Sequence, residues 1–540
     1  MDSAKRARNI IVCILLLLSL VQWRGETAAA QEDEQPLQRQ TTIVIDFTEY
    51  EWWLMRWTDN FFVCQLFVEH DGLPSAEEVL ANCGQEVYDQ WIATPPCKTA
   101  DKGEPTFNCT GLYFYFVASK PSQRTLVIDL PPPAVWLTLS GCTLSPPLNL
   151  CENLPKLLLT GEEPLPNERI TALHAIVGDK MFDCSGEVCE VPLEPTSLGG
   201  VLVEFWADSS FGDSSQHFSA NVRVLDTGVS QTPGRSGWYV DVLSSQWRGG
   251  QVESCAQIWQ TFPPVGGPPT WLSTPSEDNL LATGKPYHYL AGRLIFQGLV
   301  DASECPTNGL LANGYANACG IKKARPMVDL WQNQFDPRIL AVARETGLPA
   351  QLMKNLFAQE SQFWPGVFRV AREYGLGQIT DMGADTVLLW NNAFFDQFCP
   401  LVLDQGTCRR GYLRLKEDQR SILRGALAVQ ANADCANCPT GIDLTNADFS
   451  VMLFAQGLLA NCDQVGQTIY NATLSSPDEV SSYEDLWRFT LANYHAGPGC
   501  LAYAIHTTWS FGDELDWEHV SQQFTEACQS ALAYVDLITR

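Results

Sequence analysis

The segment that decides the fold of the C-terminal part reads Pro349-Ala350-Gln351-Leu352-Met353-Lys354-Asn355-Leu356-Phe357-Ala358-Gln359-Glu360. Pro349 suits the opening of a helix, because its fixed φ already matches the first helical turn. Leu352, Leu356 and Glu360 follow at intervals of four residues, so they share one face of that helix. The carboxylate therefore points toward the core side, where burial disfavours its ionised form. A carboxylic acid that stays protonated near neutral pH can act as a general acid.

Helix signals on both sides of this segment predict an all-α region over residues 331–540. Asp336 followed by proline fits an N-cap, and Gly347 fits the end of the same helix. Ser481 and Glu484 fit the capping box of a later helix. Further helices are expected over residues 420–430, 447–459 and 517–537.

The sequence pattern over residues 41–155 predicts a β-rich domain. Val135, Leu137 and Leu139 alternate with polar or outward-facing neighbours, which is typical of a half-buried strand. Residues 112–117 and 125–130 form two further short apolar runs, and the prolines at 131–133 end the second run because proline cannot donate to a sheet ladder. One helix is expected around residues 76–82.

Residues 165–226 predict a smaller β unit of short strands, in which Ala220, Val222 and Val224 alternate with Ser219, Asn221 and Arg223. Its size and tight turns favour an Ig-like sandwich that serves as a spacer or in wall attachment. Residues 225–238 have the glycine- and proline-rich composition of a linker. Residues 236–330 are irregular and contain three cysteines, and we interpret them as an extension of the helical module.

The bulk composition indicates a globular multi-domain chain. Its 540 residues are 45% hydrophobic and only 18% charged. The net charge of −28 excludes nucleic acid as a natural partner, because the phosphate backbone would repel it. Much of this acidity suits an exported protein that must stay soluble.

The composition of residues 1–30 predicts an export signal. Lys5, Arg6 and Arg8 precede an apolar run at 10–21, and Ala28-Ala29-Ala30 offers a cleavage site. A run of this length is short of the roughly 20 residues that a membrane span needs. We therefore expect a secreted or extracytoplasmic, cell-envelope protein, and an uncleaved N-terminal tether to the membrane or wall is the alternative.

The cysteine count predicts a disulfide framework. Nineteen cysteines less Cys13 of the export signal leave eighteen, an even number in an exported chain. Three cysteines at 255, 305 and 319 precede a block of seven, so at least one bridge must link the two stretches. Cys435 and Cys438 have the spacing of zinc ligands and could recruit Cys399 and Cys408, but export favours disulfides. We expect neither a metal nor a cofactor.

Three short motifs stand in order in the C-terminal part. They are Glu360-Ser361, then Gly375-Leu376-Gly377-Gln378, then Ala492-Asn493-Tyr494-His495-Ala496-Gly497. Together they resemble the soluble lytic transglycosylase domain, a lysozyme-like fold that cleaves peptidoglycan. The resemblance covers roughly the C-terminal two-fifths of the chain. It implies an all-α lysozyme-like domain there. With the strand patterns described above, the sequence predicts a multi-domain protein in which two small β-rich modules, the second an Ig-like sandwich, precede that domain.

The resemblance implies a reaction with Glu360 as the only acid and base. Glu360 would protonate the oxygen between N-acetylmuramic acid and N-acetylglucosamine, then take a proton from the 6-hydroxyl of the sugar as a 1,6-anhydro ring closes. The attacking oxygen belongs to the substrate, so the second carboxylate of ordinary glycosidases is not needed. Peptidoglycan glycan strands are the expected partner, and the protein is expected to act as a monomer.

The resemblance also implies roles for the residues around the acid. Ser361 would hydrogen-bond near the acid or substrate, or simply cap the helix. Gly375 and Gly377 would let the backbone turn close to the sugar, with Leu376 between them as a support residue. Gln378 would bond an N-acetyl or hydroxyl group. In the third motif, Tyr494 would reach the glutamate or pack in the core. His495 stands where the family has asparagine, and Ala496 would lie beside them.

One further departure from the family and two alternative functions remain. Glu373-Tyr374 replace the serine and alanine that commonly precede the Gly-Leu-x-Gln turn. Asp381 and Asp385 would be the first candidates for the second acid of a hydrolytic muramidase, which is one alternative. A catalytically inactive glycan-binding or scaffold protein is the other. Four aromatic residues could stack on sugar rings or fill the core: Trp331, Phe363, Trp364 and Trp390.

Overall fold

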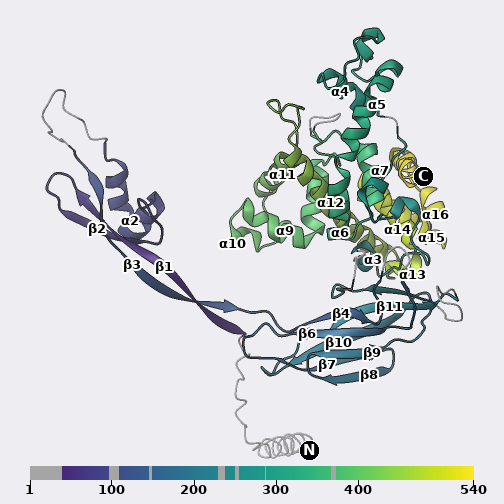
Figure 1. Ribbon diagram of the computed structural model, residues 1–540, viewed down its shortest axis with the longest axis horizontal. Helices are drawn as coiled ribbons and strands as arrows, with labels where there is room; N and C mark the ends of the chain where they lie inside the picture. The colour runs from purple at the N-terminus through teal and green to yellow at the C-terminus, as the bar shows by residue number, and fades with distance from the viewer. Residues whose placement is uncertain are drawn as a thin grey trace, which may run out of the picture. The chain divides into compact units, whose positions relative to one another are not determined.

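The computed structural model describes residues 39–95, 109–144, 149–228, 237–249, 254–285, 287–366 and 372–540. The predicted export signal over residues 1–30 lies outside these ranges. Two compact units are distinguished: Met1–Pro132 with Glu163–Glu168, and Pro133–Glu162 with Arg169–Arg540. A β-rich N-terminal region of antiparallel sheets precedes a helical C-terminal region (Figure 1), which confirms the predicted order of fold classes.

The first unit is a three-stranded sheet with one helix. Strands β1 (Gln40–Arg56), β2 (Phe62–Val68) and β3 (Leu112–Asp129) lie in the order β2-β1-β3, and α2 (Ala76–Ile92) packs on the sheet. The helix expected around residues 76–82 is present and longer. The two apolar runs at 112–117 and 125–130 are the ends of one strand, β3, which passes through Pro121. A proline is tolerated there because β3 is the edge of the sheet.

The β part of the second unit consists of two antiparallel sheets around one core. The smaller sheet has the order β4 (Ala134–Ser140), β6 (Lys156–Glu162), β9 (Val188–Pro192). The larger has the order β5 (Leu150–Cys151), β12 (Trp238–Leu243), β11 (Phe218–Asp226), β10 (Val201–Ser209), β7 (Ile170–Val177), β8 (Lys180–Ser185). Val135 and Leu137 from the first sheet and Val203, Val222 and Val224 from the second are completely buried in the shared core. The predicted alternation in β4 and β11 is thus confirmed, and β4 belongs to this unit.

The prediction that residues 225–238 form a linker between domains is wrong. β11 and β12 are neighbours in the larger sheet, with Leu225 opposite Tyr239 and Asp226 opposite Trp238. The residues between them form a connection between adjacent strands, of which 229–236 lie outside the described ranges. Glycine and proline suit a hairpin loop as well as a linker, so composition alone does not separate the two.

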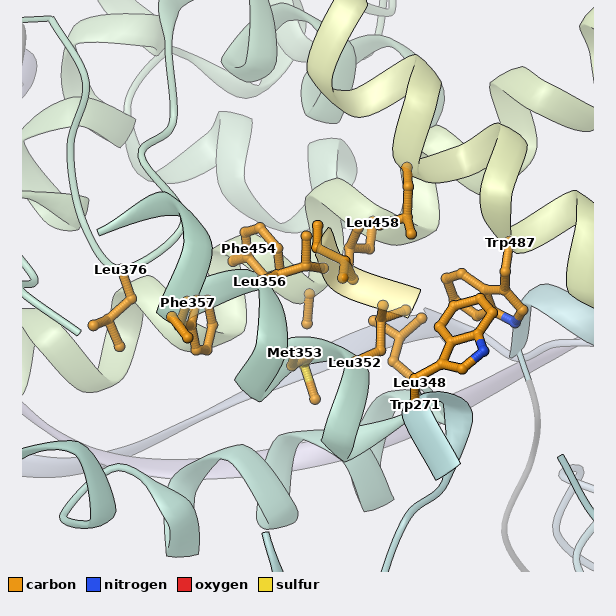
Figure 2. Packing of buried hydrophobic residues seen from close by; sticks show 14 of the residues in the cluster. Trp271, Leu348, Leu352, Met353, Leu356, Phe357, Leu376, Phe454, Leu458 and Trp487 are labelled. Carbon is orange, nitrogen blue, oxygen red and sulfur yellow. The ribbon is translucent and has the colours of Figure 1, made fainter. Parts of the chain in front are cut away.

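Fifteen described helices of the second unit make up the helical region. They are α3 (Ser254–Trp259), α4 (His288–Phe296), α5 (Ala318–Asn333), α6 (Asp336–Thr346), α7 (Ala350–Glu360), α8 (Asp381–Trp390), α9 (Asn392–Phe398), α10 (Gln405–Cys408), α11 (Glu417–Ala431), α12 (Leu444–Thr473), α13 (Pro477–Val480), α14 (Tyr483–Ala496), α15 (Pro498–Phe511), α16 (Trp517–Ser521) and α17 (Ser530–Thr539). The 30-residue helix α12 is the longest of them. Figure 2 shows how Leu352, Leu356 and Phe357 of α7 pack near Phe454 and Leu458 of α12 in the main core.

Four details of the helix predictions are wrong. Helix α5 begins before residue 331, and the expected single helix over 517–537 is divided into α16 and α17. Asp336 is the first residue of α6 and not its cap. Its buried carboxylate instead accepts hydrogen bonds from Lys354 Nζ at 2.7 and 2.8 Å, an ion pair that only the tertiary fold creates. Ser482, not Ser481, caps α14 by accepting from the backbone N–H of Asp485.

Eight disulfides join described residues. The pairs are Cys64–Cys83, Cys142–Cys151, Cys184–Cys189, Cys255–Cys462, Cys305–Cys319, Cys399–Cys408, Cys435–Cys438 and Cys500–Cys528. Cys255–Cys462 is the link expected between the two cysteine blocks. The bridges at 399–408 and 435–438 occupy the four thiols of the zinc alternative. So many bridges indicate an oxidising, extracytoplasmic environment.

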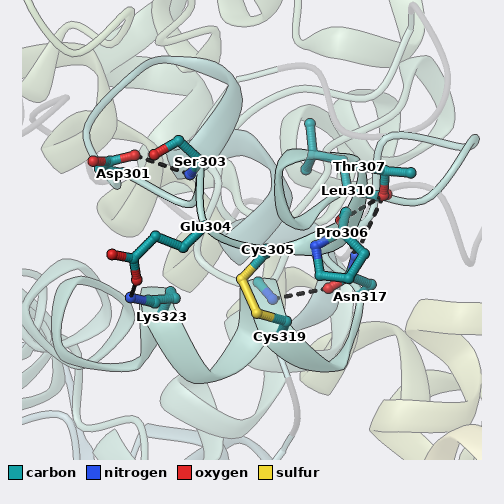
Figure 3. Close-up of a disulfide and its surroundings, with 11 residues drawn as sticks. Asp301, Ser303, Glu304, Cys305, Pro306, Thr307, Leu310, Asn317, Cys319 and Lys323 are labelled. Atoms are coloured by element: carbon teal, nitrogen blue, oxygen red, sulfur yellow. Dashed lines mark hydrogen bonds and ion pairs between the residues drawn. A yellow bond between two sulfur atoms is a disulfide. The ribbon is translucent and has the colours of Figure 1, made fainter.

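Local disulfides fasten the short segments between helices. Cys305–Cys319 closes the connection between α4 and α5, as Figure 3 shows. Around it, Lys323 pairs with Glu304 at 2.5 Å and the Asn317 side chain donates to the Pro306 carbonyl at 2.9 Å.

Among the residues that the structure describes, none of the helices combines the length and apolar character of a membrane span.

Candidate active site

One cleft of about 510 Å³ lies in the helical region. Its walls come from the ends of α7 and α14, one face of α12, the start of α8 and the hairpin of residues 374–379. The lining includes Glu360, Gly377, Gln378, Tyr494, His495 and Ala496, which are drawn from all three predicted motifs. Segments more than a hundred residues apart in sequence therefore meet at one place.

Glu360 is held at the cleft by the buried face of α7. Leu352 and Leu356 are completely buried on that face, and Glu360, the last residue of the helix, is half-buried. This confirms the predicted face of the helix. Ser361 caps α7 and is itself buried, behind the wall of the cleft. Its Oγ donates to the Leu376 carbonyl at 2.8 Å, so it ties the second motif to the helix that carries the acid.

The second motif is a tight hairpin turn. Tyr374 and Ile379 exchange backbone hydrogen bonds of 3.1 and 2.8 Å across it. Gly375 has φ +75°, and a Cβ on Gly377 would lie 1.9 Å from the ring of Phe454, so the turn needs glycine at both positions. Leu376 is completely buried and anchors the turn, and like Gly375 it does not line the cleft.

Gln378 lines the cleft, but its amide nitrogen is used inside the turn. Nε2 donates to the carbonyl oxygens of Gly375 at 2.6 Å and Gly366 at 3.2 Å. Its Oε1 is buried with no partner among the described residues. The expected bond from Gln378 to a sugar could thus be made only through that oxygen.

The third motif brings Tyr494 and His495 to the cleft from the last turn of α14. The Tyr494 hydroxyl donates to the Gly377 carbonyl and not to Glu360, so it connects the second and third motifs. The ring of Phe454 lies between the motifs, 4.8 Å from the ring of Phe357 and 5.5 Å from that of Tyr494. Burial, reinforced by Glu360 and Glu373, raises the pKa of Tyr494 well above its usual value.

The tyrosine that binds the acid is Tyr534, which sequence reasoning missed. Its hydroxyl donates to Glu360 Oε1 from helix α17, near the C-terminus. The ring of His495 stacks on it at 4.2 Å, and the loss of hydration there lowers the pKa of His495. Tyr534 has the helical spacing of an ordinary core residue beside Ala531, so no local signal marks it.

A second carboxylate, Glu373, also lines the cleft. It is half-buried. Its charge, like that of Glu360, raises the pKa of Tyr494. The carboxylates considered for this role from sequence lie elsewhere. Asp385 pairs with Arg424 at 3.0 Å, and Asp381 is exposed outside the cleft.

A cation lies close to the acid. The Nζ of Lys285 donates to Oε1 of Gln359 at 2.5 Å, and Gln359 immediately precedes Glu360 in the sequence. Burial lowers the pKa of Lys285 to about 8, although the charge of Glu360 opposes that change. Sequence patterns offer no reason to single out Lys285, because it precedes the helical motifs by about 75 residues in chain order.

Three of the four aromatic residues considered for sugar stacking belong to the core. Trp331, Phe363 and Trp364 are at most 5% exposed, and Trp331 stacks on Trp364 at 5.6 Å. Neither they nor Trp390 line the cleft. Within the described ranges, no group of three or more His, Cys, Asp or Glu side chains is placed to hold a metal ion.

The cleft therefore combines a half-buried carboxyl group, a tyrosine hydrogen-bonded to it, and a second carboxylate on the same lining. Such a set can transfer a proton to and from a ligand oxygen. Comparison of the chain with protein families, with curated proteins and with solved structures finds no match.

Proposed function

We propose that this protein is a peptidoglycan lytic transglycosylase, in which Glu360 alone acts as acid and base on the bond between N-acetylmuramic acid and N-acetylglucosamine. The observation that carries the proposal is the meeting of three motifs in one cleft: Glu360, the turn at Gly377 and Gln378, and Tyr494. The helical region would be lysozyme-like and the double sheet before it Ig-like, with a role in spacing or wall attachment.

The proposed reaction uses two proton transfers at Glu360. The carboxyl group first protonates the glycosidic oxygen, and the resulting carboxylate then accepts the proton of the sugar 6-hydroxyl as the anhydro ring closes. Tyr534 holds one carboxyl oxygen through its hydrogen bond to Oε1. This hydrogen bond fixes the orientation of the carboxyl group, and a fixed orientation of the reacting group lowers the barrier to proton transfer.

The setting of the enzyme follows from its charge and its disulfides. With a net charge of −28, the protein would hold an acidic glycan strand by hydrogen bonds within the cleft more than by long-range attraction. We infer a secreted or cell-envelope monomer, with a possible tether through its N-terminus and no nucleic-acid partner.

Glu360→Gln tests the catalytic assignment. The full-length protein and the variant are compared for clearing of purified sacculi, with Asp381→Asn as a matched control outside the cleft. We expect clearing by the parent and by the control and none by Glu360→Gln. Clearing that survives in Glu360→Gln refutes the assignment, and glycan binding without clearing in any form favours a scaffold.

One observation favours a second candidate, a hydrolytic muramidase. Glu373 lines the same cleft and could activate water as the second carboxylate of a glycosidase. Mass spectrometry of the products separates the reactions, because an anhydro end is lighter than a hydrolysed end by one water. Under transglycosylation, Glu373→Gln should still yield anhydro products. Hydrolysed products that vanish in this variant would establish the muramidase instead.

A further inference from the structure

Three amide side chains form a buried cluster on the lining of the cleft. Asn461 and Gln464 come from the cleft-facing side of α12, and Asn493 comes from α14. Their exposed fractions are only 6%, 9% and 2%. Buried amides at this depth are unusual in a core made mostly of apolar side chains, and neither Asn461 nor Gln464 belongs to a predicted motif.

The amides bond to one another but do not satisfy all of their groups. Asn493 Nδ2 donates to Asn461 Oδ1 and to Gln464 Oε1, both at 2.8 Å. Asn461 Nδ2 donates to the Gly457 carbonyl at 2.7 Å. Among the described residues, this leaves Asn493 Oδ1 buried without a donor. Gln464 uses its Oε1 within the cluster, and its Nε2 is not one of the buried atoms without a partner. The cluster thus has one buried acceptor without a partner and one amide donor that remains available to a ligand.

Unpaired buried groups destabilise a fold unless something else pairs with them. Apolar side chains would fill the same volume at no such cost, and the neighbouring cleft positions on α12, Leu453 and Phe454, are indeed apolar. A ligand that supplies one donor and one acceptor would satisfy the cluster. It would have to enter the cleft that contains Glu360.

We propose that Asn461, Gln464 and Asn493 form the subsite for the acetamido group of an N-acetylated sugar, an inference that rests on the proposed glycan-cleaving function. The acetamido N–H would donate to Asn493 Oδ1, and its carbonyl would accept from Gln464 Nε2. Its methyl group would contact the apolar positions of the same face. A hydroxyl offers a single oxygen for both bonds and no methyl group, so sugars without the acetamido group should bind more weakly.

The test measures binding by calorimetry in the full-length Glu360→Gln protein, which holds ligand without cleaving it. Chitotetraose, which carries acetamido groups, is compared with cellotetraose, which carries hydroxyls instead. We expect cellotetraose to bind roughly 10-fold more weakly or worse, the effect of losing a hydrogen bond to a buried partner. This comparison needs no substitution in the cluster.

Gln464→Glu is then added to the same protein. It keeps an oxygen for Asn493 but replaces the free amide donor, so chitotetraose affinity should fall roughly 10- to 100-fold. Gln467→Glu is the matched control, because Gln467 is exposed on the same helix and bonds Asn471 at 2.8 Å. It adds the same charge and should leave affinity unchanged.

Three results would overturn the subsite: equal affinity for the two tetrasaccharides, no binding of chitotetraose, or equal effects of the two glutamate substitutions. Failure of the proposed function looks different. If the parent protein does not clear sacculi yet binds chitotetraose through Gln464, the function is wrong and the subsite stands. If the parent clears sacculi and chitotetraose binding does not depend on Gln464, the function stands and the subsite is wrong.

Discussion

Removal of the Cys255–Cys462 disulfide should destabilise the helical region more than removal of any other described bridge. The two cysteines are 207 residues apart, whereas the other seven described pairs are separated by 28 residues or fewer. A disulfide stabilises a fold mainly by restricting the unfolded chain, and the effect grows with the logarithm of the loop that it closes.

The loop lengths set the expected magnitudes. Chain entropy gives about 5 kcal/mol for the loop closed by Cys255–Cys462 and about 2 kcal/mol for the short loop of Cys435–Cys438. The side chains of Cys255 and Cys462 are also buried, so loss of their sulfurs leaves a small cavity that adds to the first figure. The difference between the two bridges should therefore be about 3 kcal/mol or more.

Two double variants make the comparison, Cys255→Ala with Cys462→Ala, and Cys435→Ala with Cys438→Ala. Urea unfolding of each is followed by far-UV circular dichroism against the parent protein, and the free energies of unfolding are compared. Trp259, whose ring nitrogen donates to the Cys462 carbonyl at 2.9 Å, gives a local fluorescence signal. Equal losses of free energy in the two variants would refute the loop-length reasoning.

Three other contacts lead to predictions that can be measured. Tyr534→Phe removes the hydrogen bond to Glu360 and should lower kcat roughly 10- to 100-fold with little change in KM; an unchanged kcat contradicts the role given to Tyr534. Lys354→Met leaves the Asp336 carboxylate buried and unpaired and should cost about 3–5 kcal/mol in urea unfolding, and adding Asp336→Leu should restore most of that loss. The pKa of Lys285 is lowered to about 8 from its ordinary 10.5, so the unfolded chain keeps this proton to higher pH and the free energy of unfolding should rise between those two values. Urea midpoints of the parent protein and of Lys285→Met, each measured at pH 8 and at pH 10.5, test this. The midpoint of the variant should lack the rise.

The elements that could be predicted from sequence are those that local periodicity specifies. The alternation at Val135 and Leu137 indicates a strand whatever it pairs with, and the spacing of Leu352, Leu356 and Glu360 indicates a helix face whatever covers it. The connection over residues 225–238 is misinterpreted from composition because pairing of its flanking strands is a tertiary fact. Glycine and proline mark where a strand is interrupted, but they do not distinguish a hairpin loop from a linker between domains.

The same limit applies to the site. Glu360, Gln378 and Tyr494 can be found because each belongs to a short motif of neighbours in sequence. Tyr534 reaches Glu360 across 174 residues of chain, and its own surroundings look like any core helix. Glu373 stands out in the sequence only as a departure from a motif, and its place in the cleft depends on how the hairpin folds.

The Cys255–Cys462 bridge also constrains how the protein can be made. A chain that enters an oxidising compartment N-terminus first presents the thiol of Cys255 while its partner is still 207 residues behind, and six other cysteines arrive in between. Every other described pair consists of consecutive cysteines, which can close on arrival. Cys255 must therefore wait in reduced form or exchange out of a wrong pairing through a mixed disulfide. Maturation of this protein should depend on a thiol-exchange catalyst, and a fast oxidant alone should trap misbridged chains.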